Sequence, residues 1–114
     1  MLHTNLQHVM SADEHKKLIE ENENVMICCG RMGPMCIPVY ESMEELEGEY
    51  KDIKFADMEF DSPDAKVIRN LPECQSFAGL PFVVYYKNGK VVKATSSIQS
   101  RDQITEILGA NFSK

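Results

Sequence analysis

Two apolar runs joined by the dipeptide Asn88-Gly89 constrain the fold of this chain more than any other feature. The runs are "PFVVYY" at 81–86 and "KVVKATS" at 90–96, and both are rich in β-branched or aromatic residues. A two-residue hairpin turn needs residues that tolerate positive φ, and Asn followed by Gly is the strongest short signal for such a turn. We therefore predict an antiparallel hairpin over residues 81–96.

Strands and helices alternate before this hairpin, and one more helix follows it. The pattern predicts strands at 6–10, 24–29 and 53–61, and helices at 11–22, from Pro34 to about 50, at 65–71 and from 100 toward 109. Ser11 with Glu14, and Ser100 with Gln103, have capping-box spacing and mark two helix starts. Because strands separated by helices pair in parallel, we expect an α/β domain spanning 1–114, with a central mixed sheet of about five strands and about four flanking helices.

Composition excludes several classes of protein. The chain has 114 residues, of which 43% are hydrophobic, and this suits one domain with an ordinary core. The net charge of −6 and the lack of a basic patch argue against a nucleic-acid partner. No apolar run approaches the ~20 residues of a membrane span, and no signal peptide is recognised. We expect a cytoplasmic monomer without a cofactor. The three histidines, His3, His8 and His15, are expected at the surface.

Four cysteines are the candidate reactive groups: Cys28, Cys29, Cys36 and Cys74. Their spacing contains no C-x-x-C and, with the histidines, no zinc-site pattern. Cys28 and Cys29 end a buried strand, so their side chains should point to opposite faces. Cys36 falls in the first turn of the next helix, where free N–H groups and the helix dipole stabilise a thiolate. It could equally be a small apolar residue of the core-facing stripe.

The stretch "GLPFVVYYKNGKVV" resembles the part of thioredoxins in which a cis-proline precedes a strand, Lys-Asn-Gly and a second strand. Pro81 has the place of that proline, and "FADMEFDSPDA" resembles another strand of the family and its turn. The likeness extends from about Gln7 to Phe112. It implies a thioredoxin-like fold in which the loop at Leu80 and Pro81 lies beside the active site and offers backbone groups to an extended substrate peptide.

The chain departs from the family at the motif that carries the chemistry. Aligned on the Gly-Pro pair, Cys-Gly-Pro-Cys of the family becomes Met32-Gly33-Pro34-Met35, and a thioether forms neither a thiolate nor a disulfide. The aromatic residue before the motif is Arg31, and the buried acid of the preceding strand is Met26. A second alignment, counted back from Tyr50, puts Cys36 where the family has its second cysteine. Both alignments remain open.

Three functions follow from these residues. The first is thiol–disulfide exchange in which Cys36 is the working thiol. Cys29 is preferred as its partner because it ends the strand, and Cys28 and Cys74 are secondary candidates. A direct bond between Cys36 and Cys74 is disfavoured, since the resemblance puts their helices on opposite faces of the sheet.

The second function is a redox-inactive module that binds a partner protein in the same groove. The groove residues would be Met32, Gly33, Pro34, Met35, Leu80 and Pro81. The third function is Cu(I) binding, because the thioethers of Met32 and Met35 with the thiols of Cys29 and Cys36 form a set of soft donors in one loop.

Overall fold

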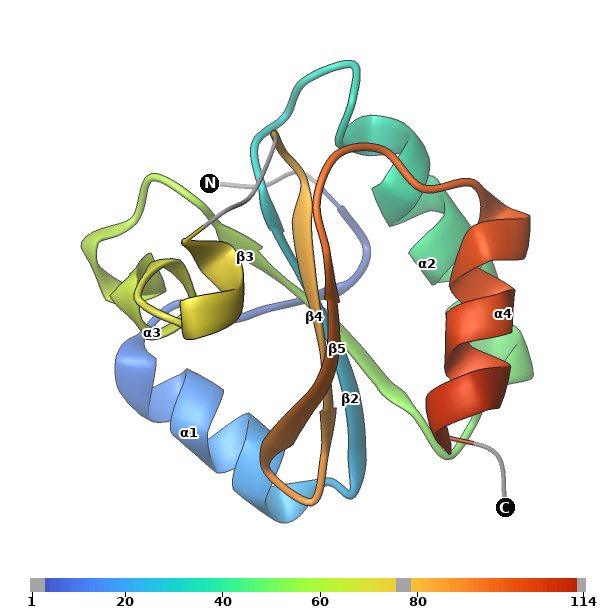
Figure 1. The fold of residues 1–114 in the computed structure, drawn as a ribbon, viewed down its shortest axis with the longest axis horizontal. Helices are drawn as coiled ribbons and strands as arrows, with labels where there is room; N and C mark the ends of the chain where they lie inside the picture. The colour runs from blue at the N-terminus through green and yellow to red at the C-terminus, as the bar shows by residue number, and fades with distance from the viewer. Residues whose placement is uncertain (1–3, 76–78, 113–114) are drawn as a thin grey trace.

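The computed structural model describes residues 4–75 and 79–112. Its elements are β1 (Gln7–His8), α1 (Ala12–Glu21), β2 (Asn24–Gly30), α2 (Ile37–Glu49), β3 (Lys54–Glu59), η1 (Pro63–Ala65), α3 (Lys66–Arg69), η2 (Pro72–Cys74), β4 (Phe82–Lys87), β5 (Lys90–Thr95) and α4 (Arg101–Phe112). The five strands form one sheet in the order β1-β3-β2-β4-β5. Figure 1 shows this sheet between two layers, with α1 and α3 on one face and α2 and α4 on the other. The predicted mixed sheet with four flanking helices is confirmed.

The central strand β2 pairs in parallel with β3 and antiparallel with β4. Strands β4 and β5 form the predicted hairpin, and its turn has positive φ at Asn88 (54°) and Gly89 (80°). The N–H of Asn88 also donates to the carbonyl of Glu23, at 2.8 Å, which ties the turn to the segment before β2.

The sheet separates two cores, and the side chains of β2 point alternately into one and the other. Met26 and Cys28 lie in the core beneath α2 and α4, which we name the α2 core. Val25, Ile27 and Cys29 lie in the core beneath α1 and α3, which we name the α3 core. Because both faces are covered, all seven residues of β2 are buried.

The predicted capping box at the start of α4 is complete, and the one at the start of α1 is formed in part, because Glu14 Oε2 accepts from the amide of Met10, at 2.9 Å, instead of closing the box. The amide of Glu14 donates to Ser11 Oγ at 3.1 Å, at the start of α1. At the start of α4, the amide of Gln103 donates to Ser100 Oγ at 3.2 Å, and the amide of Ser100 donates to Gln103 Oε1 at 2.8 Å. These side chains satisfy N–H groups that have no partner within the helix.

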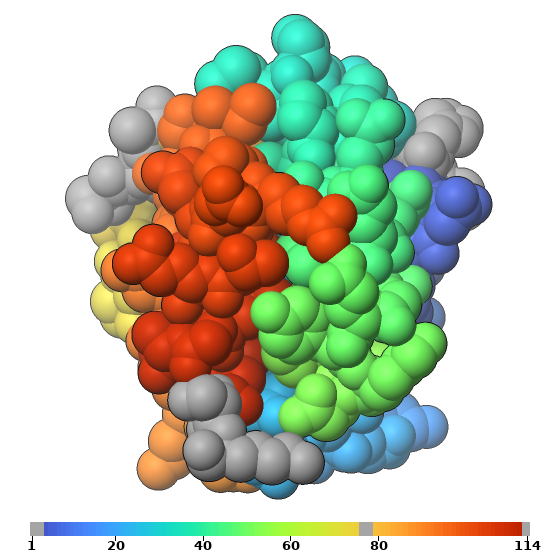
Figure 2. Space-filling model, turned by 90° about the vertical axis from the view of Figure 1, so that its right-hand side faces the viewer, coloured from blue at the N-terminus to red at the C-terminus, as the bar shows by residue number. Residues whose placement is uncertain are grey.

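Helices α2 and α4 lie side by side over the α2 core, as Figure 2 shows. On their outer surface the guanidinium of Arg101 in α4 contacts Glu45, at 2.9 Å, and Glu49 of α2. All three side chains are at least 40% exposed, so the pairs contribute little to stability. The packing of the two helices therefore depends on the apolar side chains beneath them.

Several predicted boundaries were wrong. Helix α2 begins at Ile37 rather than at Pro34, and Pro38 is the proline in its first turn. Helix α4 continues beyond Gly109 to Phe112, whose buried ring packs near Tyr85. Strand β1 spans Gln7–His8 rather than residues 6–10, and β3 spans Lys54–Glu59 rather than residues 53–61. The pairing with neighbouring strands covers these shorter ranges.

The histidines were also predicted wrongly in part. His15 is buried, and its Nε2 lies 2.9 Å from the hydroxyl of Tyr86, which satisfies its polar edge. His8 is partly buried against Asp57. His3 lies outside the described residues. Within the described ranges, no helix has the length and apolar character needed to cross a membrane.

Candidate functional site

A pocket of about 530 Å³ lies beyond the carboxyl end of β2. One wall is the loop between β2 and α2, with Arg31 and residues 33–36. The other wall is formed by Phe60 after β3 and by Gly79 and Leu80 before β4. The following peptide bond, between Leu80 and Pro81, is cis. The pocket thus brings together the loop that the sequence singled out and the proline loop that precedes the hairpin.

The loop places Cys36 at the N-cap of α2. The amides of Cys36 and Ile37 both donate to the carbonyl of Gly33, at 3.1 and 3.0 Å, and this turn leads into the helix. The backbone amide of Arg31 donates to Cys36 Sγ at 3.4 Å. This contact places the sulfur of Cys36 beside the residue that follows β2. Cys36 is only 3% exposed, and it forms part of the pocket wall.

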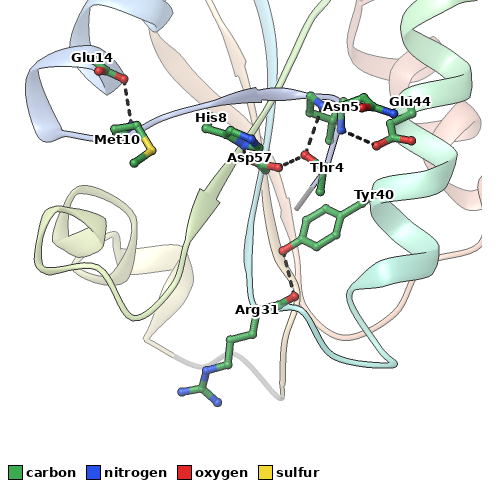
Figure 3. A network of polar contacts seen from close by, with 10 residues as sticks. Thr4, Asn5, His8, Met10, Glu14, Arg31, Tyr40, Glu44 and Asp57 are labelled. Atoms are coloured by element: carbon green, nitrogen blue, oxygen red, sulfur yellow. Dashed lines mark hydrogen bonds and ion pairs between the residues drawn. The ribbon is translucent and has the colours of Figure 1, made fainter. Parts of the chain in front are cut away.

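Gly30 permits this arrangement because it has no side chain. A Cβ at this position would lie 2.8 Å from the hydroxyl of Tyr40, 2.9 Å from Cys36 Sγ and 3.3 Å from Pro81 Cβ. The Tyr40 hydroxyl donates to the carbonyl of Arg31 at 3.2 Å, as Figure 3 shows. The sulfur of Cys36 is therefore held between the end of β2, Tyr40 and the proline loop.

Cys28 lies in the same core as Cys36 and is fully buried. Burial raises the pKa of Cys28 well above its ordinary value, and negative charge on Cys36, Cys29 and Asp57 raises it further. A hydrogen bond with Tyr40 opposes this rise. At neutral pH Cys28 is therefore an un-ionised thiol.

A buried carboxyl group lies next to Cys28 and was missed by the sequence analysis. Asp57 of β3 is aligned with Cys28 in the parallel ladder and is 0% exposed. Thr4 Oγ1 donates to Asp57 Oδ2, and His8 Nδ1 lies 2.6 Å from Oδ1 (Figure 3). Burial raises the pKa of Asp57, and these two hydrogen bonds oppose the rise. The signal in the sequence was Asp57 between the apolar residues Ala56 and Met58 of the strand "KFADME".

Cys29 and Cys74 lie in the α3 core, on the other face of the sheet. The preference for Cys29 as the partner of Cys36 is therefore corrected, because Cys28 is the neighbour that shares the Cys36 face. Burial raises the pKa of Cys29 to about 12. Each of the four cysteines is a free thiol. Cys74 and Cys36 lie in different cores, on opposite faces of the sheet, as predicted.

The four soft donors of the Cu(I) hypothesis are dispersed. Cys29 lies in the α3 core, Cys36 in the α2 core, and Met32 and Met35 are 39% and 45% exposed. One ion could not contact all four sulfur atoms, because the side chain of Cys29 points to the face of the sheet opposite Cys36. A one-residue change in the pairing register of β2 would be needed to bring Cys29 to the other face. Among the described residues no group of three or more His, Cys, Asp or Glu side chains is arranged to hold a metal ion.

Arg31 forms the outer rim of the pocket. Its Nε and Nη2 each donate to the carboxylate of Asp61 at 2.8 Å, and both side chains are more than half exposed. The guanidinium groups of Arg31 and Arg69 each lie 5.7 Å from the ring centroid of Phe60. Phe60 and Asp61 were not predicted as site residues, since nothing in the sequence links them to the loop.

Comparison with known proteins identifies the fold. No family model and no curated protein sequence matches the chain. The structure is similar to Plasmodium falciparum thioredoxin (TM-score 0.77, 20% identity, 93% of this chain and 99% of that chain). It is also similar to Chlamydomonas reinhardtii thioredoxin f2 (TM-score 0.79, 14% identity, 96% and 99%) and to Fasciola hepatica thioredoxin (0.77, 20%, 92% and 98%). The chain has the thioredoxin fold.

Proposed function

We propose that the protein carries out thiol–disulfide exchange through Cys36, with Cys28 as the second thiol. One observation carries this proposal: Cys36 Sγ accepts a hydrogen bond from the Arg31 amide in a pocket wall beside the cis-proline loop. The similarity of the fold to thioredoxins supports a redox role of this kind. The substrate would be a protein or peptide disulfide that lies against Leu80 and Pro81.

The reaction has two steps. The Cys36 thiolate attacks one sulfur of the substrate disulfide, and the other substrate sulfur leaves as a thiolate and takes up a proton. Cys28 then loses its proton and attacks Cys36 Sγ, which releases the second substrate thiol. The substrate gains two electrons, and the protein is left with a Cys28–Cys36 disulfide. A dithiol reductant returns it to the reduced state. Four free thiols suit a reducing compartment, and we propose the cytoplasm.

Reduction of insulin by the protein, with dithiothreitol as electron donor, tests the role of Cys36. We expect the Cys36→Ser variant to fall to the rate of dithiothreitol alone. The Cys74→Ser variant, altered on the other face of the sheet, should keep the rate of the unaltered protein. Equal rates for the unaltered protein and Cys36→Ser would remove Cys36 from the chemistry.

The role of Cys28 is tested by two variants that are matched controls for each other. Cys28→Ala and Cys29→Ala alter adjacent, fully buried residues of one strand, so their effects on packing should be similar. With a small disulfide as substrate, Cys28→Ala should stop at the mixed disulfide on Cys36. Cys29→Ala should release the second thiol. Intact mass distinguishes the adduct from the released form.

A redox-inactive binding module is the second candidate, and the apolar rim favours it. Met32, Met35 and Ile37 are each more than a third exposed; Met35 lines the pocket, and the other two adjoin lining residues in the chain. Methionine adapts its shape to different partners, so exposed methionines suit a docking surface. Labelling of the native reduced protein with iodoacetamide across pH separates the two functions. If only denaturant makes Cys36 reactive, the binding module is favoured over the enzyme.

A further inference from the structure

We propose that Cys29 and Cys74 form a second thiol pair, which a hydroperoxide converts to a disulfide on the face of the sheet opposite Cys36. This proposal does not depend on the function proposed for Cys36. It rests on the positions of two buried thiols that the exchange reaction does not use.

The strand β2 and the short helix η2 bring these thiols into one core. Cys29 is aligned with Met58 of β3 and with Phe82 of β4, and both of these residues also lie in the α3 core. Cys74 ends η2 and is a buried member of the same core. Figure 1 shows the α3 and η2 region on the side of the sheet away from α2. No strand therefore separates the two cysteines.

The electrostatics of the two thiols show that they interact. After burial, the charge of the Cys74 thiolate is the largest cause of the raised pKa of Cys29. Two groups shift each other in this way only when they are close. The positive charge of Arg69 acts on both thiols and favours their anions. Burial raises the pKa of both thiols, and that of Cys29 reaches about 12, so in the proposed reaction Cys74 is the thiol that ionises first and meets the oxidant.

The oxidation balances in two steps. The Cys74 thiolate attacks one oxygen of the hydroperoxide, becomes a sulfenic acid, and releases water or an alcohol. The Cys29 thiol then attacks the sulfenic sulfur, the sulfenic hydroxyl leaves as water with the proton of Cys29, and the disulfide forms. The two thiols lose two electrons and two protons, and the peroxide oxygen–oxygen bond is reduced.

The bond would join the two segments that lead into the walls of the pocket. Cys29 directly precedes Gly30 and Arg31, and Cys74 precedes Gly79 and Leu80 by a short stretch of chain. Arg31, Gly79 and Leu80 all line the pocket.

Peptide mapping of the native protein after treatment with hydrogen peroxide tests the proposal. The reaction is quenched with N-ethylmaleimide, and trypsin is used without reduction. Cys28 and Cys29 fall on peptide 18–31, Cys36 on 32–51 and Cys74 on 70–87. We expect peptide 18–31 linked to 70–87, with a mass about 2 Da below the sum of the two, because a disulfide lacks two hydrogens. Fragmentation between residues 28 and 29 assigns the linked sulfur in the unaltered protein.

The matched variants give the control. Cys28→Ala should keep the link between 18–31 and 70–87, and Cys29→Ala should lose it. Circular dichroism of both variants confirms that they fold. The proposal is overturned if peroxide yields only sulfinic acid on Cys74, or if the link passes through Cys28. A Cys28–Cys36 disulfide would instead link peptide 18–31 to peptide 32–51. The experiment therefore detects each disulfide separately, and the absence of one does not bear on the other.

Discussion

At the scale of single residues, Gly30 decides whether Cys36 can reach the pocket wall. Its missing side chain leaves the space in which the Tyr40 hydroxyl, Cys36 Sγ and Pro81 meet. The residue lies at the end of a fully buried strand, so its neighbours have little room to move. A change at this position should affect both stability and the reactivity of the thiol.

We predict that Gly30→Ala lowers the free energy of unfolding by about 1–3 kcal/mol, the usual cost of overpacking. The new methyl group must displace Tyr40 or Cys36, so the rate of Cys36 alkylation should also change. Urea unfolding and iodoacetamide labelling measure the two effects. The control is Gly109→Ala in α4, where nothing lies within 4 Å of the new Cβ. It should stabilise the helix by about 0.5–1 kcal/mol. Equal effects at both positions would contradict this account of Gly30.

The second residue-scale prediction concerns the pH dependence of Cys28. Because burial and neighbouring charges raise the pKa of Cys28, its thiolate is scarce at neutral pH. Release of the mixed disulfide on Cys36 should therefore accelerate about tenfold per pH unit, since the attacking species is the thiolate. Intact mass at timed intervals between pH 6 and about pH 9 follows the release, a range that ends near the ordinary thiol pKa. A rate independent of pH would show that Cys28 does not resolve the adduct.

At the scale of elements, the hairpin and the helix starts were predictable because they depend on neighbours along the chain. Asn88-Gly89 specifies its own turn, and the two Ser-led boxes specify the starts of α1 and α4. The start of α2 was predicted too early, because residues 33–36 form a turn before the helix begins. The carbonyl of Gly33 turns the chain before the helix begins, so Pro34 stays outside.

The hairpin makes an element-scale prediction. Gly89 has a φ of +80°, a conformation that costs an L-residue roughly 1–2 kcal/mol. Gly89→Ala should lower the free energy of unfolding by about that amount, again measured by urea unfolding. Gly48→Ala in α2 has open space around the new methyl group, and serves as a control that should be neutral or stabilising. A stable Gly89→Ala variant would mean that the turn can change its conformation.

At the scale of the whole molecule, the buried titratable groups limit the pH range of stability on both sides. Burial lowers the pKa of His15, so below about pH 6.5 the unfolded chain binds a proton that the folded chain resists, and stability falls. Burial raises the pKa of Cys28, Cys29 and Tyr85. Above about pH 8.5 the unfolded thiols ionise first, so stability falls again as pH rises.

We therefore predict a maximum of stability between about pH 6.5 and pH 8.5, the ordinary pKa values of histidine and cysteine. Urea midpoints measured from pH 5 to about pH 10, the ordinary pKa of tyrosine, describe the curve. The double variant His15→Leu with Tyr86→Phe removes both the titrating ring and the hydroxyl that contacts it. In this variant the fall of the urea midpoint below about pH 6.5 should become shallower, while the fall above about pH 8.5 should remain. An acid side of unchanged slope would exclude His15 as its cause.

The sequence by itself determined the fold class, the hairpin, two helix starts and the absence of a thiolate at Met32 and Met35. These follow from patterns within a few residues of chain, or from the chemistry of one side chain. The tertiary structure decided which neighbour, Cys28 or Cys29, faces Cys36, and that Asp57 is buried beside it. Alternation along a strand guarantees only that two adjacent side chains point apart. Which face each one takes depends on the register with β3 and β4 and on the helices that cover each side, and residues far away in the chain set both.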